Sequence, residues 1–254
     1  MIKMKTVLDH GYVQFIESWG SDERIIEAAR MSTDKGFQGW GTHHSDDCRA
    51  ELVGQPKSFA GDECCKGRPG DEKLLSYLWK NNHATPFEMA GAIIEVQAPI
   101  FVFREWHRHR TQSFNELSAR YTPMPDINYM PSVSRVMLNS GGTNKQAGTV
   151  AGADELTVGA VHAFRSSLQR GQEEAEERYQ DALRAGVPKE LARLHIPVAR
   201  YSRMRASANL RNWLAFLTLR NHAAAQWEIR QYAEVVQQML LHIFPRTIRL
   251  FEGT

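Results

Sequence analysis

Alternating apolar and polar residues predict β-strands along three stretches of the chain. The clearest stretch is 90–98, where alternate residues from Ile94 to Ala98 are apolar and the residues between them are polar. A second strand is expected over 198–208, and an earlier strand and turn within 4–18.

Apolar residues spaced three and four apart predict helices between and after these strands. Ser21 is a suitable N-cap for the first helix, and Pro99 suits the first turn of the third. The predicted helices cover residues 22–31, 71–82, 99–109, 154–185, 188–195, 209–221 and 223–243.

Two stretches lack any apolar period, about 41–70 and 138–153. Both are rich in glycine and polar residues, and we predict that they are inserted loops. A chain of 254 residues can hold one large domain, so we expect a single catalytic domain over 1–254.

The charges of the chain nearly balance. Lys and Arg number 31 against 29 Asp and Glu, and the formal net charge of +2 argues against general binding to nucleic acid or to a membrane surface. No stretch approaches the roughly 20 apolar residues of a membrane span, and the N-terminus lacks the apolar core of a signal peptide. The three cysteines do not form the pattern of a disulfide framework. We therefore expect a cytoplasmic protein.

One strongly polar segment directly follows an apolar run. The segment REWHRHRTQSFNELSARYT (104–122) carries arginines, histidines, carboxylates and serines, and the residues before it, 98–103, are apolar. Guanidinium groups bind phosphate oxygens two at a time, so cations anchored to a buried element suit a phosphate-rich ligand. We interpret 104–122 as an anion-binding part of an active site; a solvated helix end is the alternative. His109 lies between two arginines, and like-charge repulsion is expected to keep it neutral.

Further candidate arginines lie late in the chain, at Arg193, Arg211 and Arg220. Arg211 and Arg220 are nine residues apart on one predicted helix. At about 100° per residue they point in roughly opposite directions, so we expect them to contact different groups.

Other site types have weaker support. A metal site is not expected, because the spacing of the available residues does not repeat as a CxxC pair; these residues are His43, His44, Cys48, Cys64 and Cys65. Ser113 and Ser118 lack the GxSxG elbow of a hydrolase. The chain has neither a Walker loop nor a GxGxxG sequence, so phosphates are not expected to be bound in those ways.

The motifs of the chain resemble a known family. Arg-His-Arg at 108–110, followed after seven residues by Ser118 within NELSARY, is similar to the signature of the flavin-dependent thymidylate synthases. Further matching segments follow the family's order: HATPFE (83–88), APIFV (98–102), GVP (186–188), NLR (209–211) and LRNHAAAQWEIRQYA (219–233). The resemblance covers most of 1–40 and 71–245.

This resemblance implies an α/β (α+β-like) fold with a mixed central sheet flanked by helices. It also implies a homotetramer whose active sites lie at subunit interfaces. The implied cofactor is FAD, the methyl acceptor dUMP, the carbon donor methylenetetrahydrofolate and the reductant NADPH, with no nucleic-acid or membrane partner.

The resemblance also implies roles for individual residues. Arg220 would be catalytic and face the uracil. The implied cofactor-binding residues are Thr85, Arg108, His109, Arg110, Glu116, Asn209, Leu210 and Arg211, with His83 near the flavin ring or the folate. The implied substrate-binding residues are Glu105, Arg108, Ser118, Ala119, Arg120, Arg193 and Arg220.

The chain departs from the family pattern at a few of these positions. Glu105 stands where the family often has glutamine, and a carboxylate near a phosphate requires protonation or an arginine partner. Ala215 and Ala224 replace polar residues that contact flavin in relatives, and His222 is close enough in sequence to compensate.

Two rival functions are kept open. One is a flavoprotein oxidoreductase that has lost methyl transfer. The other is a nucleic-acid-binding module that uses a basic strand carrying Arg200, Tyr201, Arg203 and Arg205.

Overall fold

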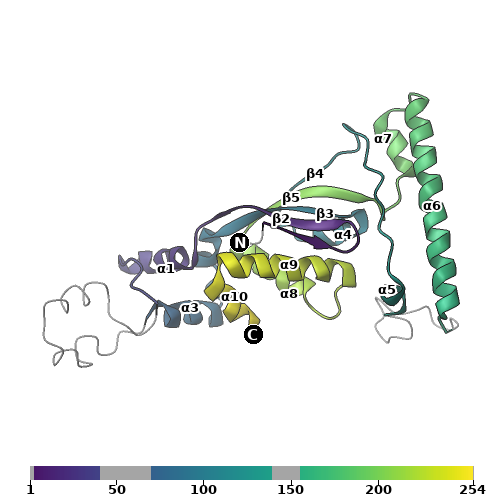
Figure 1. Cartoon of the computed structure of the whole chain (residues 1–254). Helices are drawn as coiled ribbons and strands as arrows, with labels where there is room; N and C mark the ends of the chain where they lie inside the picture. Colours follow the sequence, from purple (N-terminus) through teal and green to yellow (C-terminus); the bar gives the residue numbers. More distant parts are fainter. Residues whose placement is uncertain (1–2, 41–69, 139–154, 254) are drawn as a thin grey trace, which may run out of the picture. The chain divides into compact units, whose positions relative to one another are not determined.

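A computed structural model describes residues 3–40, 70–138 and 155–253 of the chain. Its strands form one sheet in the order β1-β2-β3-β5-β4 (Figure 1), and the pairs β1–β2 and β4–β5 are antiparallel. The strands are β1 (Met4–Val7), β2 (Gly11–Trp19), β3 (Gly91–Pro99), β4 (Ser113–Glu116) and β5 (Tyr201–Asn209). Together with the helices, this sheet confirms the predicted α/β class. The predicted inserted loops lie outside the described residues, apart from Gly70 and Leu138.

The predicted helices are present in the predicted order, and two further α-helices of the described residues, Val133–Met137 and Pro245–Glu252, were not predicted. The α-helices are α1 (Asp22–Arg30), α3 (Asp71–Lys80), α4 (Ile100–Trp106), α5 (Val133–Met137), α6 (Val158–Arg184), α7 (Lys189–Ala192), α8 (Leu210–Arg220), α9 (Trp227–Ile243) and α10 (Pro245–Glu252). Short 3-10 helices are η1 (Met31–Thr33), η3 (Thr85–Met89) and η4 (Arg193–His195).

Several predicted helix boundaries are wrong. Pro99 is the extended N-cap of α4 and not its first helical residue, and α4 ends at Trp106, before most of the polar segment. The helix predicted from residue 223 begins at Trp227. A turn precedes it, in which the Ala224 N–H donates to His222 Nδ1 at 3.1 Å.

The chain forms two compact units. The first unit comprises Met1–Ile16, Ile93–Ser207 and Phe216–Val236, and the second comprises Glu17–Ala92, Ala208–Ala215 and Gln237–Thr254. Several elements, including β3 and α8, begin in one unit and end in the other. The expectation of a single catalytic domain stays a prediction.

The core of the first unit is built on the predicted alternation in β3. Ile94, Val96 and Ala98 are buried there, as predicted, and the residues between them are partly exposed. Trp106 at the end of α4 stacks on Phe216 of α8, with ring centroids 4.5 Å apart. Apolar contact of this kind fixes the end of α4 against α8.

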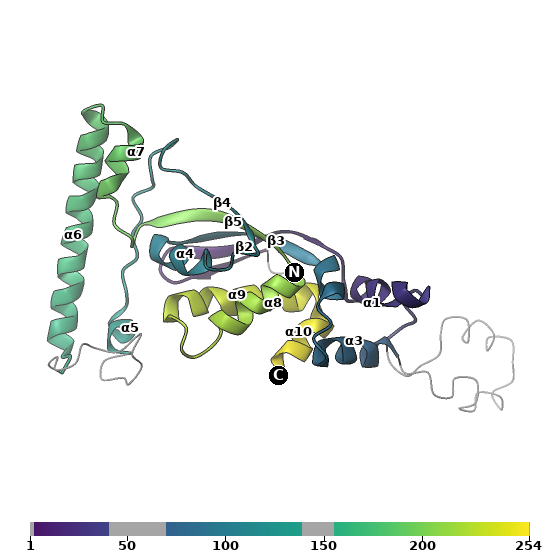
Figure 2. The same cartoon turned by 180° about the vertical axis from the view of Figure 1, so that it is seen from behind.

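Helix α6 is the longest element of the first unit and buries few of its side chains. Only Val161, Gln172 and Tyr179 are buried along its 27 residues. Its N-terminal half lies near α5 and its C-terminal end near α7 and η4 (Figure 2). The helix ends at Arg184, next to its predicted end at residue 185, and Gly186 follows with a φ of 79°, which glycine adopts readily.

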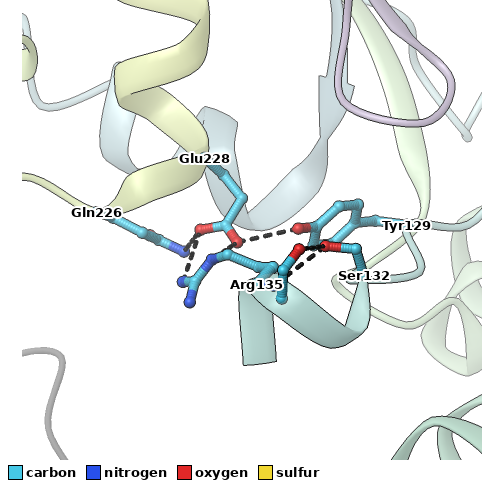
Figure 3. A network of polar contacts seen from close by, with 6 residues as sticks. Tyr129, Ser132, Arg135, Gln226 and Glu228 are labelled. Carbon is cyan, nitrogen blue, oxygen red and sulfur yellow. Dashed lines mark hydrogen bonds and ion pairs between the residues drawn. The ribbon is translucent and has the colours of Figure 1, made fainter. Parts of the chain in front are cut away.

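A polar network around the buried Glu228 joins α5 to the start of α9 (Figure 3). The Glu228 carboxylate accepts hydrogen bonds from Arg135 Nε at 2.7 Å, from the Tyr129 hydroxyl at 3.0 Å and from Gln226 Nε2 at 3.1 Å. Glu228 is buried, so these donors replace the water that would otherwise solvate its charge. Ser132 caps α5 by accepting from the Arg135 N–H.

The second unit is held by two buried carboxylates. Asp22 accepts from the Thr247 hydroxyl at 2.6 Å and from the Arg246 N–H at 2.8 Å, and Asp71 pairs with Arg30. Ser21 caps α1 by accepting from the Arg24 N–H at 3.3 Å, as predicted.

Candidate functional site

Arg220 is the last residue of α8, and its guanidinium is held by three hydrogen bonds within the first unit. Nε donates to His109 Nε2 at 2.9 Å, and Nη1 donates to Glu105 Oε2 at 2.8 Å. Nη2 donates to the backbone carbonyl of Glu105, also at 2.8 Å. Only 14% of the Arg220 side chain is exposed. A guanidinium has five N–H groups, so two remain for a ligand.

His109 is buried against one face of α8. The residue is 8% exposed, and its ring lies edge-on to the Phe216 ring, with centroids 4.9 Å apart. Burial lowers the pKa of His109 from its ordinary value to about 4, helped by the charge of Arg220 and opposed by that of Glu105. The imidazole is therefore neutral at pH 7, and since Nε2 accepts from Arg220, its proton is assigned to Nδ1.

The neutral state of His109 was predicted, but the predicted cause is wrong. The sequence neighbours Arg108 and Arg110 are exposed and do not contribute to the shift of its pKa. Burial and Arg220, which is 111 residues away in sequence, produce it instead.

Glu105 is paired with an arginine, as expected for a carboxylate that lies near a phosphate. It extends from α4, its side chain is 43% exposed, and it forms an ion pair with Arg220. The negative charge is thus balanced within the site, so a carboxylate at this position is compatible with an anionic ligand nearby.

Three arginines of the same segment remain available to an anion. The side chains of Arg104, Arg108 and Arg110 are exposed, and among the described residues no partner is found for their guanidiniums. Such free guanidiniums can pair with phosphate oxygens in the two-pronged geometry.

A second group of cations gathers around the turn at residues 118–122. The Ser118 hydroxyl accepts from the Arg120 N–H at 3.3 Å, and Ala119 between them is buried. Arg120 Nε lies 3.3 Å from Glu190 Oε2, and Arg193 Nε donates to the Glu190 carbonyl at 3.2 Å. The predicted residues Arg120 and Arg193 are therefore brought together around Glu190.

Next to this turn lies an open pocket of about 470 Å³, lined by Arg120, Tyr121, Leu183 and residues 186–190. Lys189 Nζ donates to the Tyr121 carbonyl at 3.0 Å and adds a cation to the pocket wall. Lys189 was not among the predicted site residues. Its place directly after the GVP motif was the available signal, because that motif ends α6 beside the turn.

Glu116 lies on β4, facing a histidine. His107 Nε2 is 3.9 Å from Glu116 Oε2 and 3.2 Å from Met204 Sδ. The predicted cofactor residue Glu116 thus lies on an edge strand of the sheet, within the same unit as Arg108 and Arg110.

The other predicted cofactor residues lie in the second unit. His83 and Thr85 are exposed near the start of η3, and the His83 ring lies edge-on to Tyr77. Asn209 Oδ1 caps α8 by accepting from the Asn212 N–H at 3.0 Å. Leu210 is fully buried, and its N–H donates to the Ala90 carbonyl, so its side chain belongs to the core.

Arg211 and Arg220 contact different groups, as the helix geometry predicted. Arg211 forms an ion pair with Glu88 in the second unit, and Arg220 pairs with Glu105 in the first. Ala215 and Ala224 are both exposed.

The basic strand proposed for nucleic-acid binding is contradicted by burial. Arg200 and Tyr201 have no exposed surface; Arg200 pairs with Glu176, and the Tyr201 hydroxyl donates to Asp9. Neither residue can reach a base or a phosphate, which leaves only Arg203 and Arg205 exposed.

Neither a metal cluster nor a membrane-spanning helix is found in the described part of the chain. No group of three or more His, Cys, Asp or Glu side chains there is arranged to hold a metal ion; the candidates His43, His44, Cys48, Cys64 and Cys65 lie outside these residues. Within the same ranges, no helix has the length and apolar character to cross a membrane.

The chain is similar to proteins of known activity over nearly its whole length. The family described as "Thymidylate synthase complementing protein" matches residues 14–246. A flavin-dependent thymidylate synthase of Thermus thermophilus is 33% identical over 246 residues, which cover 97% of this chain and 77% of that protein. The enzyme of that name from Thermosipho africanus is 31% identical, covering 96% and 92% of the two chains. The solved structure of a UMP/dUMP methylase, PolB, from Streptomyces cacaoi bound with 5-Br UMP has a TM-score of 0.75 at 29% identity, covering 98% of this chain and 96% of that one.

Proposed function

The chain belongs to the flavin-dependent thymidylate synthase family, and from this premise we propose that it methylates dUMP at C5 of the uracil to give dTMP. The proposed carbon donor is methylenetetrahydrofolate, and the proposed reductant is NADPH, acting through FAD. The reaction balances, because dUMP, methylenetetrahydrofolate, NADPH and one proton give dTMP, tetrahydrofolate and NADP⁺. The relationship to PolB, described as a UMP/dUMP methylase, supports a uridine nucleotide as the methyl acceptor.

The observation that carries this proposal is the fixed guanidinium of Arg220. Uracil C5 becomes a nucleophile only when negative charge develops on the ring. A guanidinium held in advance, with two N–H groups still available, stabilises that charge without reorganising during the reaction. Its partly buried setting strengthens the interaction relative to water.

The free arginines fit a flavin dinucleotide. Arg104, Arg108 and Arg110 present three exposed guanidiniums on one short segment, and a pyrophosphate carries oxygens that guanidinium pairs bind well. We assign the pyrophosphate of FAD to Arg108 and Arg110. When bound, the flavin supplies the hydride chemistry that amino-acid side chains lack.

The nucleotide phosphate is assigned to the pocket beside residues 118–122. Ser118 offers a hydroxyl, and Arg120, Lys189 and Arg193 offer cations around one carboxylate, that of Glu190. Three cations against one carboxylate leave a net positive charge, which suits a phosphate dianion.

Two wider features complete the proposal. We propose a homotetramer in which active sites lie at subunit interfaces, and a cytoplasmic location. The many exposed side chains of α6, among them Phe164, are compatible with contacts to other subunits.

The proposal is tested by tritium release from 5-tritiated dUMP with NADPH and methylenetetrahydrofolate, with and without added FAD. We expect flavin-dependent release together with dTMP formed in equal amount. A parallel reaction with 5-tritiated UMP measures whether the chain also accepts the ribonucleotide, since the methylase with the similar fold is described for both.

The same assay separates methyl transfer from the rival oxidoreductase function. NADPH oxidation by a flavin-loaded protein without tritium release or dTMP would identify an oxidoreductase that has lost methyl transfer.

A further inference from the structure

We propose that His109 is a positioning residue for the catalytic guanidinium: its neutral Nε2 accepts from Arg220 Nε and, with Glu105, fixes the orientation of the Arg220 fork. This inference rests on the proposed function of Arg220. It gives His109 a task that differs from direct flavin contact, the role implied by its place in the Arg-His-Arg motif.

The geometry leaves the guanidinium little freedom. Its bonds to His109 Nε2, Glu105 Oε2 and the Glu105 carbonyl engage all three of its nitrogens. A planar group bonded through three nitrogens cannot rotate about its own axis without breaking at least one bond. The two remaining N–H groups therefore point in fixed directions.

His109 is itself held in place by the helix that carries Arg220. Phe216 and Arg220 are four residues apart on α8 and share a face. The His109 ring contacts the Phe216 ring and bonds to Arg220, so the imidazole lies along this face. With so little of the residue exposed, water cannot easily replace the ring as the acceptor for Nε.

The charge state of the imidazole matches this task. Arg220 Nε can only donate, so its partner must present a lone pair. A neutral ring with its proton on Nδ1 presents one, whereas a protonated ring has none and would repel the guanidinium. The charged groups facing the ring are Arg220 and Glu105, both part of the same bonded cluster.

Removing the His109 acceptor is expected to slow turnover while FAD and dUMP still bind. In His109→Ala, Nε loses its partner and the guanidinium is held only by its two bonds to Glu105, so it is less firmly oriented. Misplacement of a catalytic group by about 1 Å costs on the order of 100-fold in rate, and we expect a fall in kcat of that order at saturating FAD and dUMP. His109→Gln, whose Oε1 can accept near the former position of Nε2, is expected to restore most of the rate.

The decisive experiment is a double-mutant cycle of His109→Ala and Arg220→Lys, measured as kcat with flavin occupancy checked by absorbance. If His109 acts through Arg220, the double variant is about as slow as Arg220→Lys alone. Losses that multiply would overturn the proposal and leave His109 as a flavin contact or a packing residue. His242→Ala, at an exposed position of α9, serves as the matched control.

A second readout does not depend on activity. The ¹⁵N resonances of the His109 ring report which nitrogen carries the proton. We expect an unprotonated Nε2 and a protonated Nδ1 in the wild type at pH 7, and a mixture of tautomers in Arg220→Gln. A wild-type ring protonated on Nε2 would refute the contact even in a protein that forms no dTMP. The absence of dTMP alongside the expected tautomer would reject the proposed function and leave the contact standing.

Discussion

The carboxylate and the backbone carbonyl of Glu105 both accept hydrogen bonds from the guanidinium of Arg220. One residue thus supplies both a negative charge and a fixed main-chain anchor. The two contributions can be separated by mutation, because a substitution changes the carboxylate and leaves the carbonyl.

We predict that Glu105→Gln keeps the hold on Arg220 but removes the counter-charge. The amide oxygen can still accept from Nη1, so the fork stays oriented while its positive charge is less neutralised. Since Glu105 is partly exposed and screened, we expect kcat to rise only about two- to tenfold. Steady-state kinetics at saturating dUMP checks this, with Glu105→Ala, which lacks both the charge and the side-chain acceptor, as the comparison. A fall of kcat in Glu105→Gln to the level of Glu105→Ala would show that the charge itself is needed.

Lys189 is predicted to bind the nucleotide phosphate. Lys189→Gln removes one charge-assisted contact, and we expect the KM for dUMP to rise about tenfold with kcat little changed. Lys73→Gln, at an exposed position of α3, is the control. An unchanged KM in Lys189→Gln would remove the pocket beside residues 118–122 from the binding site.

His109 makes stability depend on pH in a defined window. Its folded pKa of about 4 lies below the ordinary 6.5, so the unfolded chain binds more protons between these values. Stability is therefore fully present above about pH 6.5 and declines as pH falls towards 4, by at most about 3 kcal/mol. Urea unfolding at several pH values measures how the free energy of unfolding changes with pH. This change should be smaller in His109→Gln.

Glu228 is predicted to be a structural residue of the first unit. Glu228→Ala removes the acceptor that the partly exposed Arg135 side chain shares with the buried Tyr129 hydroxyl, and breaking a largely buried ion pair costs about 3 kcal/mol. Urea denaturation should show this loss. Glu174→Ala removes an exposed ion pair with Arg178 and should cost less than about 1 kcal/mol. Equal losses in the two variants would contradict the structural role.

Local periodicity explains why most elements could be predicted from the sequence. The alternation over 90–98 and the apolar stripe of α9 report burial directly, and the cap at Ser21 marks the start of α1. The strand β4 could not be found in this way, since Ser-Phe-Asn-Glu is short and polar and becomes a strand only by pairing with β5. The short helices α5 and α10 were missed as well.

The residues of the candidate site differ in the same way: those in local motifs could be predicted from the sequence, and their long-range contacts could not. The motif residues around Arg108 could be named from the sequence, because the family signature is local. The bonds of Arg220 to His109 and Glu105 could not, since they join residues 111 and 115 positions apart. Burial supplies the main cause of the neutral histidine, and burial is a property of the folded chain, which adjacent arginines do not reveal.

The main-chain anchor at Glu105 has an evolutionary consequence. A backbone carbonyl is present whatever side chain the codon specifies, so no missense change at position 105 can delete the hydrogen-bond acceptor for Arg220 Nη2. Selection at this position therefore acts on charge and on the second bond only. An exchange of glutamate for glutamine at this position would therefore never release the arginine.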